Sequence, residues 1–156
     1  MEGGSGSINM DVRMVTLPTF KDFRGELSVV ELFGGKFPEL DFPVKRIYYL
    51  HDLNEEATRG GHAHKRVHQV FFCISGLASC SLEDRSGDTV AVVLSKHHEG
   101  LYVPPMVWHT LGGFEPGTTI LVFASDHHDE EEYIRNLEEF HYECSFSGPK
   151  VTVPIH

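Results

Sequence analysis

The sequence predicts a single all-β domain, an antiparallel sandwich or barrel with one short helix near the C-terminus. Ten short runs of β-branched and aromatic residues follow one another between residues 12 and 124. Turn-forming residues separate these runs and no helical pattern interrupts them, which is typical of antiparallel sheets. A length of 156 residues with 40% hydrophobic residues fits one domain with a packed core.

The expected strands are bounded by Gly, Pro, Asp or Asn, residues that favour turns. The segment Asp84–Asp88 (DRSGD) is one such turn. In chain order the expected strands are Val12–Leu17, Gly25–Leu32, Val44–Leu50, His62–His64, Val67–Ile74, Leu77–Glu83, Thr89–Leu94, Gly100–Val103, Trp108–Gly112 and Thr119–Ala124.

One segment has helical periodicity. Residues 129–140 bring four apolar side chains to one helix face, namely Tyr133, Ile134, Leu137 and Phe140. Asp129 and Glu132 have the spacing of a capping box, and acidic residues favour the N-terminal end of a helix. The sequence therefore predicts one amphipathic helix that closes the barrel.

We expect three regions along the chain. Residues 1–10 open with the linker-like MEGGSGS and form a flexible start. Residues 11–142 form the folded domain, and residues 143–156 form a C-terminal tail.

The composition excludes several classes of protein. With 13 Lys+Arg against 23 Asp+Glu, the net charge of −10 argues against nucleic-acid binding. No apolar stretch approaches the ~20 residues that cross a bilayer, so we expect no membrane association. Three cysteines without a CxxC spacing indicate free thiols and a cytoplasmic location.

The charge balance changes between residues 44 and 66. This stretch has a net charge of +2, from Lys45, Arg46, Arg59, Lys65 and Arg66 against Asp52, Glu55 and Glu56. Arg46 and Tyr48 are two residues apart in an expected strand, so both side chains point to one face. The sequence therefore predicts that a small anionic ligand binds here.

Two histidines follow this basic stretch in the segment Arg59–Lys65 (RGGHAHK). In a strand, His62 and His64 share one face and Ala63 points to the other. This pattern has three interpretations: metal ligands, proton-transfer groups, or buried histidines without chemistry.

The wider spacing resembles the two-part cupin motif, in which HxH is followed by an acidic residue, a glycine, and later Pro and His. Metal-binding cupins use three histidines and a glutamate; the matching residues here are His62, His64, Gln69 and His109. Because a neutral amide replaces the carboxylate, a divalent metal loses its charge compensation, although three histidines can hold zinc. We therefore expect no metal and no cofactor, and we interpret the histidines as acid–base or binding groups.

Four segments together resemble the dTDP-sugar 3,4-ketoisomerases. They are Lys45–Tyr49 (KRIYY), Arg59–Lys65 with Gln69, Tyr102–His109 (YVPPMVWH), and Ala124–Glu130 (ASDHHDE) with Tyr133–Arg135. The resemblance implies that residues 11–142 are a cupin ketoisomerase domain, a double-stranded β-helix or jelly roll. It also implies a homodimer that exchanges N-terminal strands and an enzyme without a cofactor.

The activity implied by the resemblance is conversion of a dTDP-4-keto-6-deoxyhexose, such as dTDP-4-keto-6-deoxyglucose, into its 3-keto isomer. The product would supply a 3-amino sugar for surface polysaccharides such as O-antigens or S-layer glycans. His62 would remove the C3 proton, His64 would assist, and Tyr48 would supply a hydroxyl. Arg24 and His109 would select the 3-keto-6-deoxygalactose product.

Substrate binding is predicted for a further group of residues. The diphosphate would contact basic residues of the stretch 44–66, among them Arg46, Arg59 and Lys65, and Gln69 would line the site. Gly61 and His68 depart from the family pattern, in which a larger residue and an acid are common.

Two other functions stay open at this stage. A metal-dependent cupin enzyme, such as a dioxygenase or isomerase, would contain about one transition-metal ion per chain. A non-catalytic cupin would bind dTDP without solvent deuterium entering the sugar. We find no His–Asp pairing of the related 3,5-epimerases in this sequence.

Overall fold

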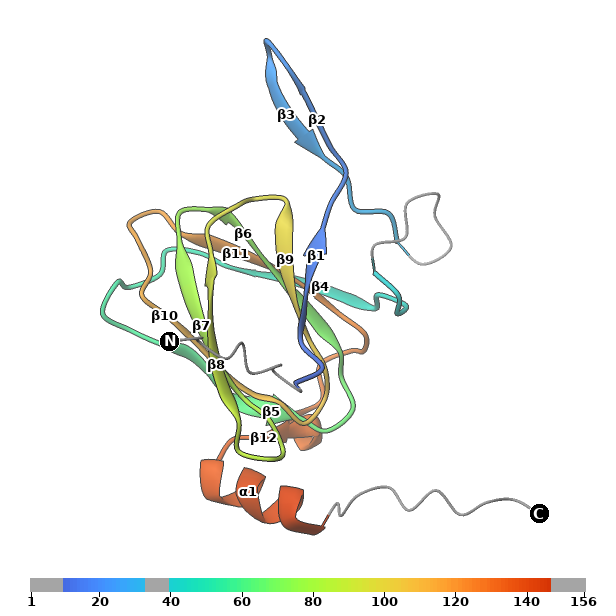
Figure 1. The fold of residues 1–156 in the computed structure, drawn as a ribbon, viewed down its shortest axis with the longest axis vertical. Helices are drawn as coiled ribbons and strands as arrows, with labels where there is room; N and C mark the ends of the chain where they lie inside the picture. The colour runs from blue at the N-terminus through green and yellow to red at the C-terminus, as the bar shows by residue number, and fades with distance from the viewer. Residues whose placement is uncertain (1–9, 33–39, 147–156) are drawn as a thin grey trace, which may run out of the picture.

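The computed structural model describes residues 10–32 and 40–146, which form two antiparallel sheets that face each other as a cupin barrel (Figure 1). The first sheet has the order β1 (Arg13–Thr16), β9 (Glu99–Val103), β6 (Gln69–Ser75), β11 (Thr119–Ala124), β4 (Arg46–Leu50). The second has the order β12 (Tyr133–Ile134), β5 (Arg59–His64), β10 (Trp108–Gly112), β7 (Ala78–Glu83), β8 (Thr89–Leu94). The predicted fold class is confirmed.

The core lies between the two sheets because the strands alternate between inward apolar and outward side chains. Phe71, Leu101 and Ile120 of the first sheet meet Leu82 and Leu111 of the second, all fully buried. This packing fills one part of the barrel and leaves the part around β4 and β5 available for polar side chains.

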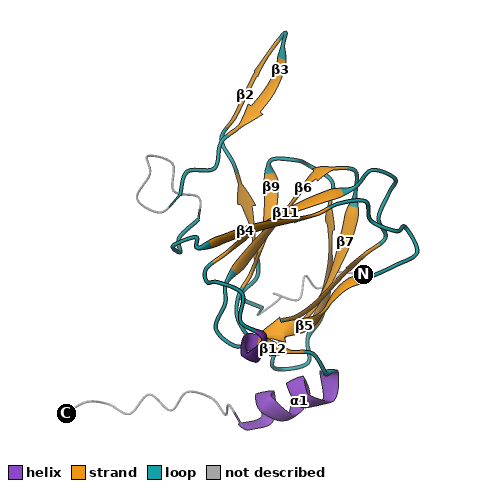
Figure 2. Ribbon diagram, turned by 180° about the vertical axis from the view of Figure 1, so that it is seen from behind, coloured by secondary structure: helices purple, strands orange, loops and turns teal. Residues whose placement is uncertain are grey.

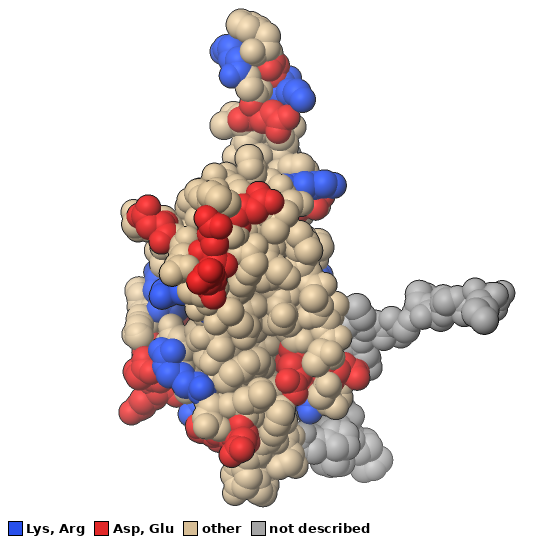
Figure 3. Space-filling model, turned by 90° about the vertical axis from the view of Figure 1, so that its left-hand side faces the viewer, with Lys and Arg blue, Asp and Glu red and all other residues tan. Residues whose placement is uncertain are grey.

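A hairpin of β2 (Thr19–Asp22) and β3 (Gly25–Ser28) projects away from the barrel (Figure 1). The sequence predicted only the second of these strands. Phe20, Phe23 and Leu27 are 57%, 99% and 63% exposed. Ion pairs of Lys21 with Glu26 and of Arg24 with Asp22 place charges of both signs near the tip (Figure 3). Exposed apolar side chains on a projecting hairpin are typical of a surface that another chain covers.

The predicted single helix over residues 129–140 is wrong. A 3₁₀ turn at Glu130–Glu132, the short strand β12 and helix α1 (Leu137–Phe146) occupy this region (Figure 2). Strand β12 pairs with β5, and this pairing interrupts the helix that the local periodicity favours.

Asp129 and Glu132 at the start of this region do not form the predicted capping box. The Asp129 side chain accepts a hydrogen bond from the Glu131 backbone and caps the 3₁₀ turn. Glu132 is buried, and its carboxylate accepts a 2.6 Å hydrogen bond from the Arg66 backbone N–H. Glu132 thereby links the 3₁₀ turn to the chain directly after β5.

Helix α1 covers the outer face of β5 and β12 (Figure 2). Phe140 packs with Ala63, Ile134 and Met106, and all four side chains are buried. The helix continues to Phe146, four residues beyond the domain boundary predicted at 142, and the boundaries stay predictions. Residues 1–9 and 147–156, most of the predicted flexible start and tail, lie outside the described residues.

No helix within the described ranges is both long and apolar enough to span a membrane.

Candidate active site

Strand β5 brings two imidazoles into the barrel. His62 and His64 face inward and their ring centroids are 5.1 Å apart, while Ala63 faces α1 and is fully buried. His109 of β10 lies opposite His62 in the strand register, with ring centroids 4.8 Å apart. Two neighbouring strands thus gather three histidines, with ring nitrogens within 4.8 Å of one another.

A bulge makes this close approach possible. The register between β5 and β10 shifts at His109 and Thr110, opposite Gly60 and Gly61. Both glycines have positive φ, and a Cβ on Gly60 would lie 2.9 Å from the His109 carbonyl oxygen. Glycine is therefore required at position 60, because any side chain would push the two histidine strands apart.

Tyr133 of β12 joins the cluster from the other side of β5. Its ring centroid lies 4.9 Å from that of His62 and 4.5 Å from that of His64. The Arg135 guanidinium lies 4.2 Å from the Tyr133 ring centroid, a cation–π distance, and forms a bidentate pair with Glu130.

The first sheet supplies the opposite wall. Tyr48 of β4 accepts a 2.8 Å hydrogen bond from the Gln69 amide of β6. The Arg46 guanidinium lies 5.3 Å from the Tyr48 ring centroid, on the same face of β4. The shared face of Arg46 and Tyr48 agrees with the alternation expected from the sequence.

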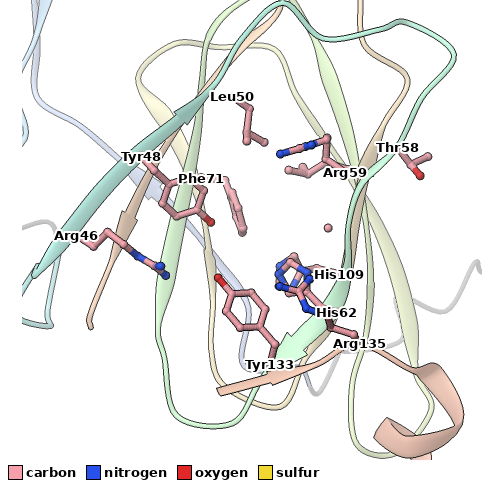
Figure 4. A pocket seen from close by; sticks show the side chains of 12 residues that line it. Arg46, Tyr48, Leu50, Thr58, Arg59, His62, Phe71, His109, Tyr133 and Arg135 are labelled. Atoms are coloured by element: carbon pink, nitrogen blue, oxygen red, sulfur yellow. The ribbon is translucent and has the colours of Figure 1, made fainter. Parts of the chain in front are cut away.

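These side chains surround a cavity of about 390 Å³ (Figure 4). Among the described residues that line it there are three arginines and no carboxylate. The cavity therefore attracts anions even though the whole chain carries a charge of −10. The lining residues are Arg46, Tyr48, Leu50, Thr58, Arg59, Gly60, His62, Phe71, His109, Leu111, Tyr133 and Arg135.

Several buried polar atoms of the site have no hydrogen-bond partner within the described part of the chain. They are Arg46 Nε, His62 Nδ1, both ring nitrogens of His64, and Gln69 Oε1. An unpaired buried polar atom costs about 1–3 kcal/mol, so natural proteins concentrate such atoms where a ligand or water satisfies them.

Comparison with known proteins agrees with this geometry. The FdtA family model, described as "WxcM-like, C-terminal", matches residues 10–145. A TDP-4-oxo-6-deoxy-alpha-D-glucose-3,4-oxoisomerase from Aneurinibacillus thermoaerophilus is 35% identical over 132 residues, 84% of this chain and 91% of that protein.

Two solved structures share the fold. A mutant of the 3,4-ketoisomerase QdtA from Thermoanaerobacterium thermosaccharolyticum, in complex with TDP-4-keto-6-deoxyglucose, has a TM-score of 0.81 and 30% identity. The similarity covers 87% of this chain and 95% of that one. A 3,4-ketoisomerase from Helicobacter canadensis has a TM-score of 0.81 and 32% identity, covering 87% and 98%.

The chain belongs to the dTDP-sugar 3,4-ketoisomerase family. The family and the enzyme class predicted from the sequence motifs are thereby confirmed.

The three clustered histidines of this ketoisomerase all have lowered pKa values. Burial lowers the pKa of His62 to about 4 and that of His64 to about 3, and nearby Arg135 adds to both shifts. Burial and the adjacent His62 lower the pKa of His109 to about 3. All three rings are therefore neutral at pH 7: His64 and His109 are disfavoured as charged hydrogen-bond donors, and the His62 ring keeps one unprotonated nitrogen.

The pKa of Tyr48 shifts in the opposite direction. Burial, followed by the proximity of Tyr133, raises the pKa of its hydroxyl to about 12. Tyr48 therefore keeps its proton at pH 7 and can donate a hydrogen bond to an oxygen that gains negative charge.

A divalent metal fits this site poorly. Three histidines suffice geometrically for zinc. However, the position of the fourth cupin ligand is Gln69, whose amide donates to Tyr48, and the described cavity lining carries only positive charge. The residues therefore suit an anionic ligand better than a cation.

The structure brings most of the predicted site residues together. Arg46, Tyr48, Arg59, His62 and His109 line the cavity. His64 and Gln69 are buried directly behind them.

Two predicted residues lie elsewhere. Lys65 lies in the bend directly after β5, is exposed, and is not among the residues that line the cavity. Arg24 is at the tip of the projecting hairpin and pairs with Asp22 rather than with any residue of the cavity in the same chain.

Sequence reasoning missed Tyr133 and Arg135 as site residues. Both stand in a motif of the resemblance, but the predicted helix over residues 129–140 closes the barrel and gives them no role in the site. A strand interpretation would have found them, since Tyr133 and Arg135 flank the fully buried Ile134 in an alternating pattern.

His68, the departure that sequence could not explain, lies outside the cavity. Its Nδ1 is 2.6 Å from the Tyr102 hydroxyl, and its ring stacks on Phe42. His68 therefore packs on the outer face of the first sheet.

The buried histidines predict a stability that falls with acid. The unfolded chain binds protons near the ordinary histidine pKa of ~6.5, whereas the folded cluster does so only near pH 3–4. The free energy of unfolding is therefore highest above pH ~6.5. It decreases as the pH falls, by up to about 1.4 kcal/mol per pH unit for each ring. Urea unfolding between pH 7 and 4.5 measures this slope.

The matched pair for this experiment is His64→Asn and His127→Asn, the second at an exposed turn. We expect the slope to decrease for the first variant and to stay unchanged for the second. Equal slopes in all three proteins would contradict burial as the cause.

Proposed function

We propose that this ketoisomerase moves the keto group of dTDP-4-keto-6-deoxyglucose from C4 to C3 through an enediolate, without a metal or other cofactor. The observation that carries the proposal is the His62 ring, held between His64 and His109 in a cavity that three arginines line. A neutral base removes a proton from carbon, and the cationic cavity retains a sugar diphosphate.

The carbon chemistry needs one base. The C4 ketone acidifies the hydrogen on C3, and His62 accepts this proton to give an imidazolium and an enediolate. His62 then returns the proton to C4, which leaves the ketone at C3. His64 and His109 surround His62 and keep water away from the ring, which favours transfer back to the sugar over loss to solvent.

The negative charge on the C4 oxygen requires a fixed donor. Tyr48 faces the cavity, keeps its proton at pH 7, and is held by the Gln69 amide. We assign to Tyr48 the hydrogen bond that stabilises the enediolate, and to Gln69 the positioning of Tyr48.

The diphosphate is assigned to the arginines at the cavity. Arg46 Nε has no partner within the described residues, and Arg59 lines the cavity with an exposed side chain. Guanidinium groups bind phosphate oxygens in bidentate geometry, which suits both residues. Lys65 lies after the end of β5, outside the cavity lining, and takes no part in this assignment.

The hairpin of β2 and β3 supports a homodimer with exchanged N-terminal strands. Its exposed apolar side chains stabilise the protein only when another chain covers them. In such a dimer the Arg24 of one chain reaches the cavity of its partner, where it acts with His109 to favour the 3-keto-6-deoxygalactose product. A self-complementary exchange of this kind satisfies twofold symmetry.

The biological setting follows from the proposed product. A 3-keto sugar nucleotide is the substrate of an aminotransferase, so we place the enzyme in the cytoplasm, in 3-amino-sugar synthesis for surface glycans.

The first test is NMR of dTDP-4-keto-6-deoxyglucose incubated with the protein in heavy water. We expect the 3-keto isomer, deuterium exchange at C3, and the galacto configuration at C4. Binding of dTDP without deuterium entry would favour a non-catalytic binding protein. Loss of activity after chelation, with about one transition ion per purified chain, would favour a metal-dependent cupin.

His62→Asn is expected to abolish exchange at C3 while dTDP affinity stays within about threefold, because only the base is lost. His64→Asn is expected to slow isomerisation less than His62→Asn does, because His64 assists His62 and is not itself the base. His97→Asn, at an exposed loop, is the matched control and keeps wild-type turnover. Normal turnover by His62→Asn would contradict the assignment of the base.

Mixed dimers test the role of the hairpin. Activity in this experiment is the formation of the 3-keto-6-deoxygalactose product, which Arg24→Ala and His62→Asn should each lose alone, since each damages every site of its own homodimer. Refolding the two variants together should restore about a quarter of wild-type activity, because half of the dimers then contain one intact site. No recovery in a verified mixed dimer would contradict the contribution of Arg24 to its partner.

A further inference from the structure

The imidazole of His64 is not oriented by a hydrogen bond. A ring that takes part in proton transfer needs a fixed direction, because the proton moves over a short distance between aligned atoms. Such a ring is usually fixed by a hydrogen bond from one nitrogen to a carboxylate or a backbone carbonyl. His64 is buried, and within the described part of the chain neither of its ring nitrogens has a hydrogen-bond partner. Its orientation therefore depends on packing against neighbouring side chains.

Tyr133 is the closest aromatic neighbour of His64 among the described residues. The centroids of these two rings are 4.5 Å apart, whereas the centroid of His64 is 5.1 Å from that of His62 and 6.0 Å from that of His109. Tyr133 also packs edge-on against His62, with centroids 4.9 Å apart (Figure 4). One phenol ring thus contacts both histidines of β5 and restricts the rotation of each.

The Tyr133 ring is itself held in place by its surroundings. Tyr133 lies directly opposite His64 in the register of β12 and β5, which makes the two a cross-strand pair. The next residue, Ile134, is fully buried beneath α1 and anchors β12. The Arg135 guanidinium lies 4.2 Å from the Tyr133 ring centroid, and a bidentate pair with Glu130 holds that guanidinium. The ring is therefore a firm surface for the histidines to pack on.

Orientation by packing has a consequence for the chemistry of His64. A carboxylate partner would occupy one ring nitrogen and would favour the protonated ring. Contacts between rings leave both nitrogens of His64 free to exchange protons. They also add no negative charge that would oppose the effect of burial, which lowers the pKa of His64 to about 3.

We propose that Tyr133 is a positioning residue whose aromatic ring, rather than its hydroxyl, orients the imidazoles of His64 and His62 for proton transfer. The observed contacts of Tyr133 with both histidines are contacts between rings, so a phenyl ring is sufficient for this role. The inference rests on the proposed ketoisomerase function, but the orientation of His64 can be measured without any substrate.

The first test is NMR relaxation of histidine rings labelled with ¹³C at Cε1, in protein without ligand. His64→Asn assigns the His64 signal. We expect the His64 ring to be rigid on the ps–ns timescale in the wild-type protein and in Tyr133→Phe, which keeps the aromatic ring. It should become mobile in Tyr133→Leu, which keeps apolar bulk but lacks a ring. Equal ring order in all three proteins would overturn the proposal.

The second test separates kcat from KM for formation of the 3-keto product. Tyr133→Phe is expected to keep kcat within about threefold of wild type. Tyr133→Leu is expected to lower kcat by about 100-fold, the effect of displacing a reacting group by ~1 Å, while KM stays within about threefold. Tyr142→Leu is the matched control, because Tyr142 is 64% exposed on α1, and it keeps wild-type kcat and ring order.

Two kinetic results would contradict the proposal. A loss of kcat in Tyr133→Phe as large as in Tyr133→Leu would assign the role to the hydroxyl. A higher KM with unchanged kcat in Tyr133→Leu would make Tyr133 a substrate-binding residue instead.

Urea unfolding and dTDP affinity show whether Tyr133→Leu is folded. Tyr133→Met, with an unbranched side chain that fills irregular space, replaces it if it does not fold, and the same results are expected. If the wild-type protein forms no 3-keto product, the proposed function fails, while the ring mobility still tests the role of Tyr133. If the wild-type protein converts the substrate and the variant without the ring keeps wild-type ring order and kcat, only the role of Tyr133 fails.

Discussion

The pairing of β5 with its two neighbours is the constraint on which the site depends. β10 places His109 opposite His62, and β12 places Tyr133 opposite His64. Because side chains alternate along a strand, a slip of one residue would turn these groups out of the cavity. The register is held from outside, where Ala63 packs under α1, and at the strand end, where Glu132 accepts from the Arg66 backbone.

Most of the fold was predictable because its strands carry their own local signals. All ten predicted runs overlap observed strands, since alternating apolar residues and turn residues are features of the sequence itself. The helix over residues 129–140 failed for a different reason. Tyr133 and Ile134 pair with a strand about 70 residues earlier, and a local periodicity of apolar residues contains no information about that partner. The first strand of the hairpin, Thr19–Asp22, was missed as well.

The site residues were likewise predictable only where a local pattern fixes the direction of the side chain. His62, His64, Arg46 and Tyr48 were found because spacing within one strand fixes their faces. Tyr133 and Arg135 were missed as site residues because only a contact distant in sequence brings them to the cavity. Lys65 lies one position beyond the end of β5 and outside the cavity lining, and the sequence pattern does not fix where that strand ends. Arg24 lies at the tip of a hairpin that projects from the barrel and pairs with Asp22, so no contact among the described residues of this chain brings it to the cavity.

In the proposed mechanism, a desolvated cluster of neutral imidazoles performs proton transfer in a cavity lined by arginines. The most direct measurement is ¹⁵N NMR of the histidine rings between pH 8 and pH 4, with His62, His64 and His109 assigned by single substitutions. The account predicts that all three rings keep the chemical shifts of neutral imidazole down to about pH 5. Protonation of His62 close to the ordinary value of ~6.5 would contradict it.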